Sequence, residues 1–153
     1  MDSNYLWLNM QGIFKPVNFK KYKGDYTRIV YRSSWELKVM RSLDSDDTVL
    51  EWSSEEIAIP YVSPKDGRIH RYFPDFFVRK KDGCYILEVK PLNQSIPPTV
   101  SKKKTKKYIN EVITYGTNIS KWKAAKEYCT GRGWRFQVLT ERDLNIVSKY
   151  SKR

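Results

Sequence analysis

The sequence predicts an α/β domain, a mixed β-sheet flanked by α-helices, and three observations lead to this fold class. An early segment places apolar residues on one face of a helix. The stretch between residues 49 and 90 holds short apolar runs separated by turn residues, as expected of strands. Helical periodicity then returns before a further strand-like run, and this order of elements is typical of one sheet-centred domain.

The first predicted helix begins after Ser33. Its segment, SSWELKVMRSLD, has Glu36, Val39, Met40 and Leu43 at the spacing i, i+3, i+4, i+7, which predicts an amphipathic helix. Ser33 precedes the first turn and is a favoured residue type for capping the free backbone amides there. We therefore expect one face of this helix to pack on the sheet.

Several strands are predicted to follow. The sequence favours strands over VLEW (49–52), EEIAIPYV (55–62), residues 69–79 and CYILEVK (84–90). Turn residues at 63–68 and an Asp-Gly pair within 80–83 predict hairpin connections. The run 84–90 is almost continuously apolar, which predicts a central strand that ends at Pro91.

The second half of the chain is predicted to contain helices around one more strand. A lysine-rich segment leads into a helix up to about Tyr115, and Gly116 is expected to break it. A second helix is predicted to begin at Asn118 or Ser120 and to end near Gly131 or Gly133. WRFQVL (134–139) has the composition of a strand. The sequence TERD, which starts at Thr140, resembles the cap of a last helix.

Length and charge bound the class of protein. The 153 residues predict one main domain over 29–150, preceded by an irregular N-terminal arm over 1–28. A net charge of +12 and a pI of about 9.7 favour a polyanionic partner, nucleic acid first. Cys84 and Cys129 fit no zinc spacing or disulfide framework, which indicates a reducing compartment. Since no apolar run reaches about 18 residues, we expect a soluble cytosolic protein without a membrane partner.

Asp75, Glu88 and Lys90 stand out because they interrupt strand-like sequence. Side chains alternate along a strand, so Glu88 and Lys90 share a face, and the hairpin at 80–83 would return this strand beside Asp75. Two carboxylates at cross-strand distance repel each other unless a cation lies between them. Mg²⁺ suits this place, because it often takes one or two carboxylates together with substrate phosphate oxygens and water. Lys90 would orient the attacking water or steady the charge developing on the phosphate.

Each of these acids also has a simpler interpretation. Glu36 completes the capping box Ser33-x-x-Glu36, in which the carboxylate bonds to a backbone amide at the helix start. The same residue lies on the helix face that points toward the core, where an acid could complete a metal site. Asp75, Glu88 and Lys90 could instead belong to an exposed edge strand with ordinary ion pairs. The residues alone leave these alternatives open.

A family resemblance covers about residues 20–147. Glu36, Pro74-Asp75 and Glu88-Val89-Lys90 resemble the motif of the PD-(D/E)xK nuclease superfamily. The segments YRSSWELKVMRSLD, VLEWSSEEIAIPY, RYFPDFFV, LEVKP and NISKWKAAKEYC with GWRFQVLTERDL resemble the head-completion nucleases of T4-like tailed phages. That family is in turn similar to the catalytic domain of Tn7-type transposon-end endonucleases.

The resemblance implies a restriction-endonuclease-like fold and a metal-dependent DNA endonuclease that acts in phage head completion after DNA packaging. It implies Asp75, Glu88 and Glu36 as metal ligands and Lys90 as the catalytic lysine, with Mg²⁺ as the metal and Mn²⁺ as a substitute. The partners it implies are DNA and the capsid, portal or neck proteins. The expected location is the host cell cytoplasm, with association to the virion as an alternative.

The segment SKKKTKK (101–107) predicts contacts with DNA phosphates, because lysines that neutralise phosphates release counterions. The residues concerned are Lys102, Lys103, Lys104, Lys106 and Lys107. A solvated helix face is the alternative. Trp122 is expected to pack in the core and His70 to be an ordinary surface residue.

Two rival functions remain: a basic head-assembly protein that binds DNA or the portal without cleaving, and a transposon-end or restriction-type nuclease with the same chemistry.

Overall fold

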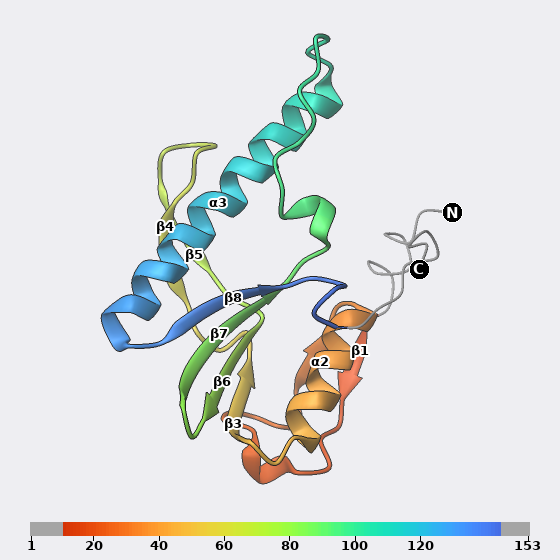
Figure 1. Ribbon diagram of the computed structural model, residues 1–153, viewed down its shortest axis with the longest axis vertical. Helices are drawn as coiled ribbons and strands as arrows, with labels where there is room; N and C mark the ends of the chain where they lie inside the picture. The colour runs from red at the N-terminus through yellow and green to blue at the C-terminus, as the bar shows by residue number, and fades with distance from the viewer. Residues whose placement is uncertain (1–10, 145–153) are drawn as a thin grey trace.

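The computed structural model describes residues 11–144 and is built around a four-stranded sheet (Figure 1). The strand order is β3-β6-β7-β8, with bounds Val49–Ser54, Phe76–Lys80, Gly83–Val89 and Arg135–Leu139. β3, β6 and β7 run antiparallel, whereas β8 pairs parallel to β7. The sheet is therefore mixed, and the predicted strand at 84–90 lies inside it as β7, buried over its second half.

One helix covers each face of this sheet. On one face, α2 (Ser34–Ser45) packs Met40 and Leu43 into a core with Trp52 and Leu87. On the other face, α3 (Lys106–Arg132) contributes the remaining core clusters together with strand residues. The alternation of side chains along β6 and β7 divides the apolar residues between the two helices. The predicted fold class, a mixed sheet flanked by helices, is confirmed.

Shorter elements surround the central sheet. The pair β1 (Gly12–Phe14) and β2 (Ile29–Tyr31) precedes α2, with the 3₁₀ turn η1 (Phe19–Lys21) between the two strands. The hairpin of β4 (Ile59–Val62) and β5 (Ile69–Tyr72) packs beside α3. A second 3₁₀ turn, η2, covers Leu92–Gln94 after the central strand.

Part of the predicted N-terminal arm joins the core. Phe14 and Tyr22 are buried in the same cluster as Trp52. The ring of Tyr22 lies edge-on to that of Trp52 with centroids 4.8 Å apart. Residues 1–10 lie outside the described residues, and the boundary proposed at residue 28 stays a prediction.

The predicted strand over 69–79 is wrong as one element. The chain forms β5 up to Tyr72 in the two-stranded sheet and then β6 from Phe76 in the central sheet. Pro74, which cannot donate to a ladder, lies in the break between them. The break lets Asp75 stand at the start of a central strand.

The predicted helix break at Gly116 is also wrong. α3 continues through this residue, because a glycine inside a helix costs only about 1 kcal/mol and the buried part of the helix, from Asn118 to Cys129, begins just after it. Thr105 caps the start, and Gly133 ends the helix in the left-handed conformation at φ 70°. The helix predicted after Thr140 falls mostly outside the described residues, which end at Leu144.

Candidate active site

Asp75 and Glu88 meet where β6 begins and β7 ends. The antiparallel register pairs Phe76 with Leu87, which places the preceding Asp75 beside Glu88. One carboxylate oxygen of Asp75 accepts a hydrogen bond from the backbone N–H of Val89 at 2.7 Å. Glu88 is buried, and Asp75 is half-buried, so protein surrounds the pair while Asp75 keeps a path to solvent. The hairpin that the Asp-Gly signal predicted therefore brings the two acids together.

The two carboxyl groups are electrostatically strained. Burial raises the pKa of Asp75 well above its ordinary value, and the nearby charges of Glu88 and Glu36 raise it further. Burial also raises the pKa of Glu88, while the hydroxyl of Tyr72 and the charge of Lys90 offset part of that rise. Two neighbouring acids that both resist ionisation form a place where a cation is stabilised.

Glu36 forms the capping box at the start of α2. The hydroxyl of Ser33 accepts from the N–H of Glu36 at 3.1 Å, and the Glu36 carboxylate accepts from the N–H of Arg32 at 3.1 Å. Burial raises the pKa of the Glu36 carboxyl group, and these hydrogen bonds lower it in part. The cap interpretation is thus confirmed. Its charge also acts on Asp75 and raises the pKa of that carboxyl group.

An ion pair that the sequence did not indicate ties this cap to Asp75. The guanidinium of Arg32 donates two hydrogen bonds of 3.0 Å to the Glu55 carboxylate. Glu55 follows β3, has a φ of 54°, and donates its N–H to the carbonyl oxygen of Asp75 at 3.1 Å. Left-handed backbone at a residue other than glycine is costly and concentrates at functional sites. The start of α2 and the start of β6 are therefore held in one arrangement.

Lys90 follows β7 directly. Its backbone N–H donates to the carbonyl oxygen of Leu139 at 2.9 Å, which fixes the end of β7 against the end of β8. The charge of its ammonium group lowers the pKa of both Asp75 and Glu88 and so opposes the larger effect of burial. Asp75, Glu88 and Lys90 thus lie together where β6 begins and β7 ends, and the charge of Glu36, from the start of α2, acts on Asp75.

Two further residues, Tyr72 and Lys121, were not predicted for the site. Tyr72, at the end of β5, donates a hydrogen bond from its hydroxyl to the Glu88 carboxylate. Lys121, on α3, has its Nζ 5.7 Å from the Tyr72 ring centroid, and its charge acts on Glu88. Sequence patterns could not place either residue, because β5 belongs to another sheet and α3 lies far along the chain. Trp122, next to Lys121, is buried as predicted.

The five lysines of 101–107 stand apart from this edge. All are exposed, and they lie at and before the N-terminus of α3, the end of the helix that extends away from the sheet in Figure 1. The first turn of α3 contains no acidic residue. His70 is exposed and contacts Asp66 at 2.8 Å, in line with an ordinary surface role.

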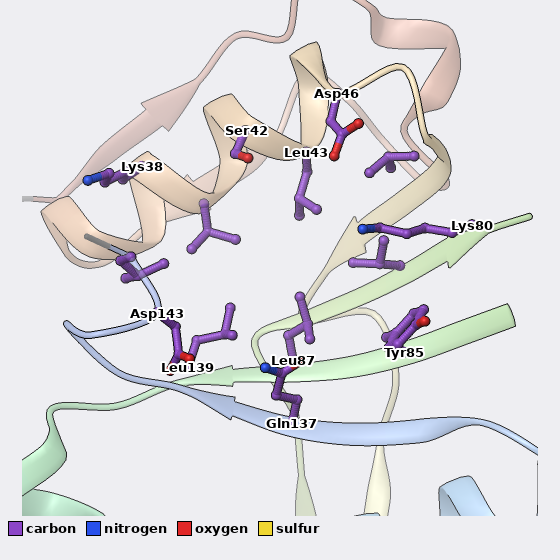
Figure 2. A pocket seen from close by; sticks show the side chains of 14 residues that line it. Lys38, Ser42, Leu43, Asp46, Lys80, Tyr85, Leu87, Gln137, Leu139 and Asp143 are labelled. Atoms are coloured by element: carbon purple, nitrogen blue, oxygen red, sulfur yellow. The ribbon is translucent and has the colours of Figure 1, made fainter. Parts of the chain in front are cut away.

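A cavity of about 520 Å³ lies on the α2 side of the sheet (Figure 2). Its lining includes Leu43, Tyr85 and Leu87, together with the exposed Lys38 and the half-buried Lys80. None of the four predicted catalytic residues lines this cavity. Since Leu87 and Glu88 point to opposite faces of β7, the cavity and the acid pair lie on different sides of the sheet.

A second groove, of about 840 Å³, runs between the segment after β7 and the first half of α3. One wall is formed by residues of α3 between Lys106 and Asn118. Asn118 lies less than one helical turn before Lys121. Its other wall includes Asn93, Gln94 and two prolines. The groove thus connects the lysine-rich end of α3 with the part of the helix that approaches the acid pair.

The donor set at the acid pair suits a hard cation. Asp75 and Glu88 each offer carboxylate oxygens, and Mg²⁺ commonly binds one or two carboxylates and completes its shell with substrate oxygens and water. Within residues 11–144, no group of three or more His, Cys, Asp or Glu side chains is arranged to hold a metal ion. A role for Glu36 as a third ligand therefore stays a prediction.

The fold and this acid pair define the class of the protein as a restriction-endonuclease-like domain of the PD-(D/E)xK type. Residues 46–141 match the family described as TnsA-like endonuclease N terminal. The chain is also 36% identical over 141 residues to the head completion nuclease of Enterobacteria phage T4, a match that covers 89% of this chain and 94% of that protein. The chain therefore belongs to the TnsA-like endonuclease family. The matched range contains Asp75, Glu88 and Lys90 and begins after Glu36.

No helix in the described part of the chain combines the length and apolar character needed to cross a membrane.

Proposed function

We propose that the protein is a divalent-metal-dependent DNA endonuclease that acts in phage head completion. The observation that carries the proposal is the juxtaposition of Asp75 and Glu88, both with raised pKa values, beside the charge of Lys90. Membership of an endonuclease family supports the chemistry, and the similarity to a head completion nuclease over most of both chains supports the biological role.

Mg²⁺ is the cofactor we propose, with Asp75 and Glu88 as ligands, Glu36 as a further acid and Mn²⁺ as a substitute. When bound, it would supply a water of lowered pKa and neutralise charge on the phosphate. The protein's own part is to hold the two carboxyl groups in place, where a cation would favour their ionised forms. The backbone N–H of Val89 fixes Asp75, and the hydroxyl of Tyr72 fixes Glu88.

Lys90 has a separate task in this proposal. Its ammonium group would donate hydrogen bonds to the attacking water or to the phosphate oxygens as negative charge develops during hydrolysis. The anchoring of its backbone to Leu139 limits the movement of the chain that carries it. Such preorganised donors are typically worth about 10²- to 10³-fold in rate.

The exposed lysines at the start of α3 would bind flanking DNA. Lys106 and Lys107 lie at a helix N-terminus, whose partial positive charge adds to theirs and favours a phosphate. Lys106 precedes Lys121 by 15 residues, which is about 22 Å along a helix. DNA that contacts both Lys106 and Lys121 would therefore have to extend well beyond the cleaved bond.

The decisive experiment incubates purified protein with plasmid DNA in Mg²⁺, in Mn²⁺ or in EDTA, and compares wild type with Glu88→Ala. We expect nicking by wild type with either metal, none in EDTA, and a loss of at least about 1,000-fold in the variant, since a ligand and its charge are removed. Glu127→Ala, which removes an exposed acid from α3, is the matched control and should cleave normally.

The same experiment separates the rival functions. A protein that only binds would shift DNA on a gel and never nick it, which would refute the enzyme. Full activity of Glu88→Ala would refute this site. The role in head completion has its own test, because extracts lacking the protein should accumulate DNA-filled heads that fail to join tails and should recover when it is added.

A further inference from the structure

We propose that Lys121 is a DNA phosphate-binding residue of this site, which would hold a phosphodiester of the bound strand next to the acid pair. The inference rests on the proposed function and extends it, because it adds a second cation contributed by α3 to the one that the motif supplies. Three observations on the described residues carry it: the two aromatic rings that contact the Lys121 side chain, its lack of an ion pair, and the charge of Lys90 near the same acid.

Two aromatic rings hold the Lys121 side chain. Its Nζ lies 5.7 Å from the ring centroid of Tyr61 and 5.7 Å from that of Tyr72. Tyr61 and Tyr72 belong to β4 and β5, the hairpin that packs on α3. Tyr72 also bonds to Glu88. The ammonium group is thus positioned by the same side chain that orients a predicted metal ligand, which gives it a defined place relative to the acid pair.

Lys121 lies near Glu88 but forms no ion pair among the residues that the structure describes. Among the residues that the structure describes, the ion pairs involve Arg28, Arg32, His70 and Arg79 but not Lys121. Burial lowers the pKa of Lys121 most, and the charges of Lys90 and Lys65 lower it further, while Glu88 raises it. Lys90 and Lys121 thus both lie near Glu88, and neither forms an ion pair among the described residues, so both ammonium groups are available to an anion.

A packing role alone explains this arrangement less well. A cation over an aromatic ring contributes about 0.5 to 2 kcal/mol, but a methionine would fill the same space between Tyr61 and Tyr72 without the cost of burying charge beside Lys90. A phosphate accounts for both the charge and its position, because it is the anion that the proposed substrate brings to this edge. The groove between the segment after β7 and α3, which ends at Asn118, offers the strand a route to the same place.

The test measures DNA binding rather than cleavage. Wild type, Lys121→Met and Lys123→Met bind a fluorescent duplex in EDTA over a range of salt concentrations. Each lysine to phosphate contact contributes about 0.9 to the slope of log affinity against log salt. We expect the slope for Lys121→Met to be less steep by about 0.9. The affinity that this variant loses relative to wild type should then be about 3.5-fold smaller at 200 mM salt than at 50 mM salt.

Lys123→Met is the matched control, because it removes the same charge from an exposed position two residues further along α3. We expect its slope to stay within error of wild type, and Lys121→Arg to keep the wild-type slope. Melting temperatures verify folding, and Lys121→Gln replaces the methionine variant if that one unfolds. An unchanged slope in the variant without the charge, with wild type still cleaving plasmid, overturns the role of Lys121 and leaves the proposed function intact. A slope lowered as expected in a protein that never cleaves overturns the enzyme and keeps Lys121 as a DNA contact.

Discussion

The two faces of the central sheet differ in what they bury. On the α2 face the strands contribute apolar residues, with Trp52 fully enclosed and Phe76 1% exposed, and the buried acids Glu36 and Asp44 come from the helix, not from the sheet. On the α3 face the apolar residues Phe77 and Ile86 share the layer with Tyr72 and Glu88. The same strands thus carry a conventional core on one side and ionisable groups on the other.

This difference separates stability from function. Burial of large apolar side chains is the main favourable contribution to folding, whereas a buried carboxylate opposes it. We therefore expect the α2 face to contribute most of the free energy of folding. This contribution offsets the cost of holding acids on the other face of the sheet. The cavity lies on the α2 face, which stabilises the fold. The candidate active site lies on the face whose carboxyl groups oppose folding.

The largest effect is expected on the α2 face. Trp52→Ala should lower the free energy of unfolding by about 3 to 5 kcal/mol, since it leaves a cavity among Phe14, Tyr22 and Phe76. Urea unfolding followed by circular dichroism measures this loss. Val100→Ala, at a residue that is 87% exposed, should change stability by less than about 0.5 kcal/mol. A loss below about 1 kcal/mol for Trp52→Ala would contradict the division between the faces.

Glu36 tests where the boundary between the faces lies. Glu36→Gln keeps the capping box, because an amide oxygen also accepts from the backbone, but it removes the charge beside Asp75. We expect cleavage to fall about 100-fold, equivalent to about 2.7 kcal/mol, with little change in unfolding. Single-turnover cleavage at saturating DNA measures it. Unchanged cleavage would assign Glu36 to the cap alone.

Asp75→Asn should show how much the Asp75 carboxylate destabilises the folded protein. An amide oxygen still accepts the N–H of Val89, and the buried charge is removed, so the metal-free variant should be more stable than wild type by about 1 to 2 kcal/mol, or about 2 to 6 °C in melting temperature, while cleavage is lost. Thermal melting in EDTA measures the gain. A variant less stable than wild type at neutral pH would show that the carboxylate stabilises the fold.

The same pair gives a pH dependence of known sign. Burial raises the pKa of Asp75 in the folded state, so the folded protein binds more protons than the unfolded chain at intermediate pH, and the contribution of Asp75 to stability falls as pH rises. The advantage of Asp75→Asn should therefore be small near pH 4 and increase toward neutral pH. With Mg²⁺ present, wild type should recover stability at neutral pH and the variant should not.

The smallest effect is expected at the helix cap. Ser33→Ala removes the hydroxyl that accepts from the N–H of Glu36 at 3.1 Å and should lower the free energy of unfolding by about 1 kcal/mol. Ser33→Thr, which keeps the hydroxyl, is the control and should lose less. Chemical unfolding detects the difference. A larger effect on cleavage than on stability would show that the cap also positions the acid beside Asp75.

The two mistaken expectations have a common physical origin. The predictions for Gly116 and the run 69–79 rest on local preferences, which were too weak to decide either outcome. α3 continues through Gly116 because both halves of the helix belong to one long element capped at Thr105 and Gly133. The run 69–79 divides because its two halves pair with different strands, β4 and β3. Preferences of about 1 kcal/mol at single residues do not decide such cases.

The sequence by itself determined the acid motif, the cap at Ser33, the hairpin between β6 and β7 and the family resemblance. The cap and the hairpin depend on residues close in the chain, whose spacing fixes their geometry through the periods of helix and strand, and the resemblance depends on the order of the motifs along the chain. Only the tertiary structure decided that Tyr72 bonds to Glu88, that Arg32 reaches Glu55 and that Lys121 stands over two tyrosine rings. Those contacts join elements 16 or more residues apart, and their distances follow from how sheet, hairpin and helix pack, which no local period encodes.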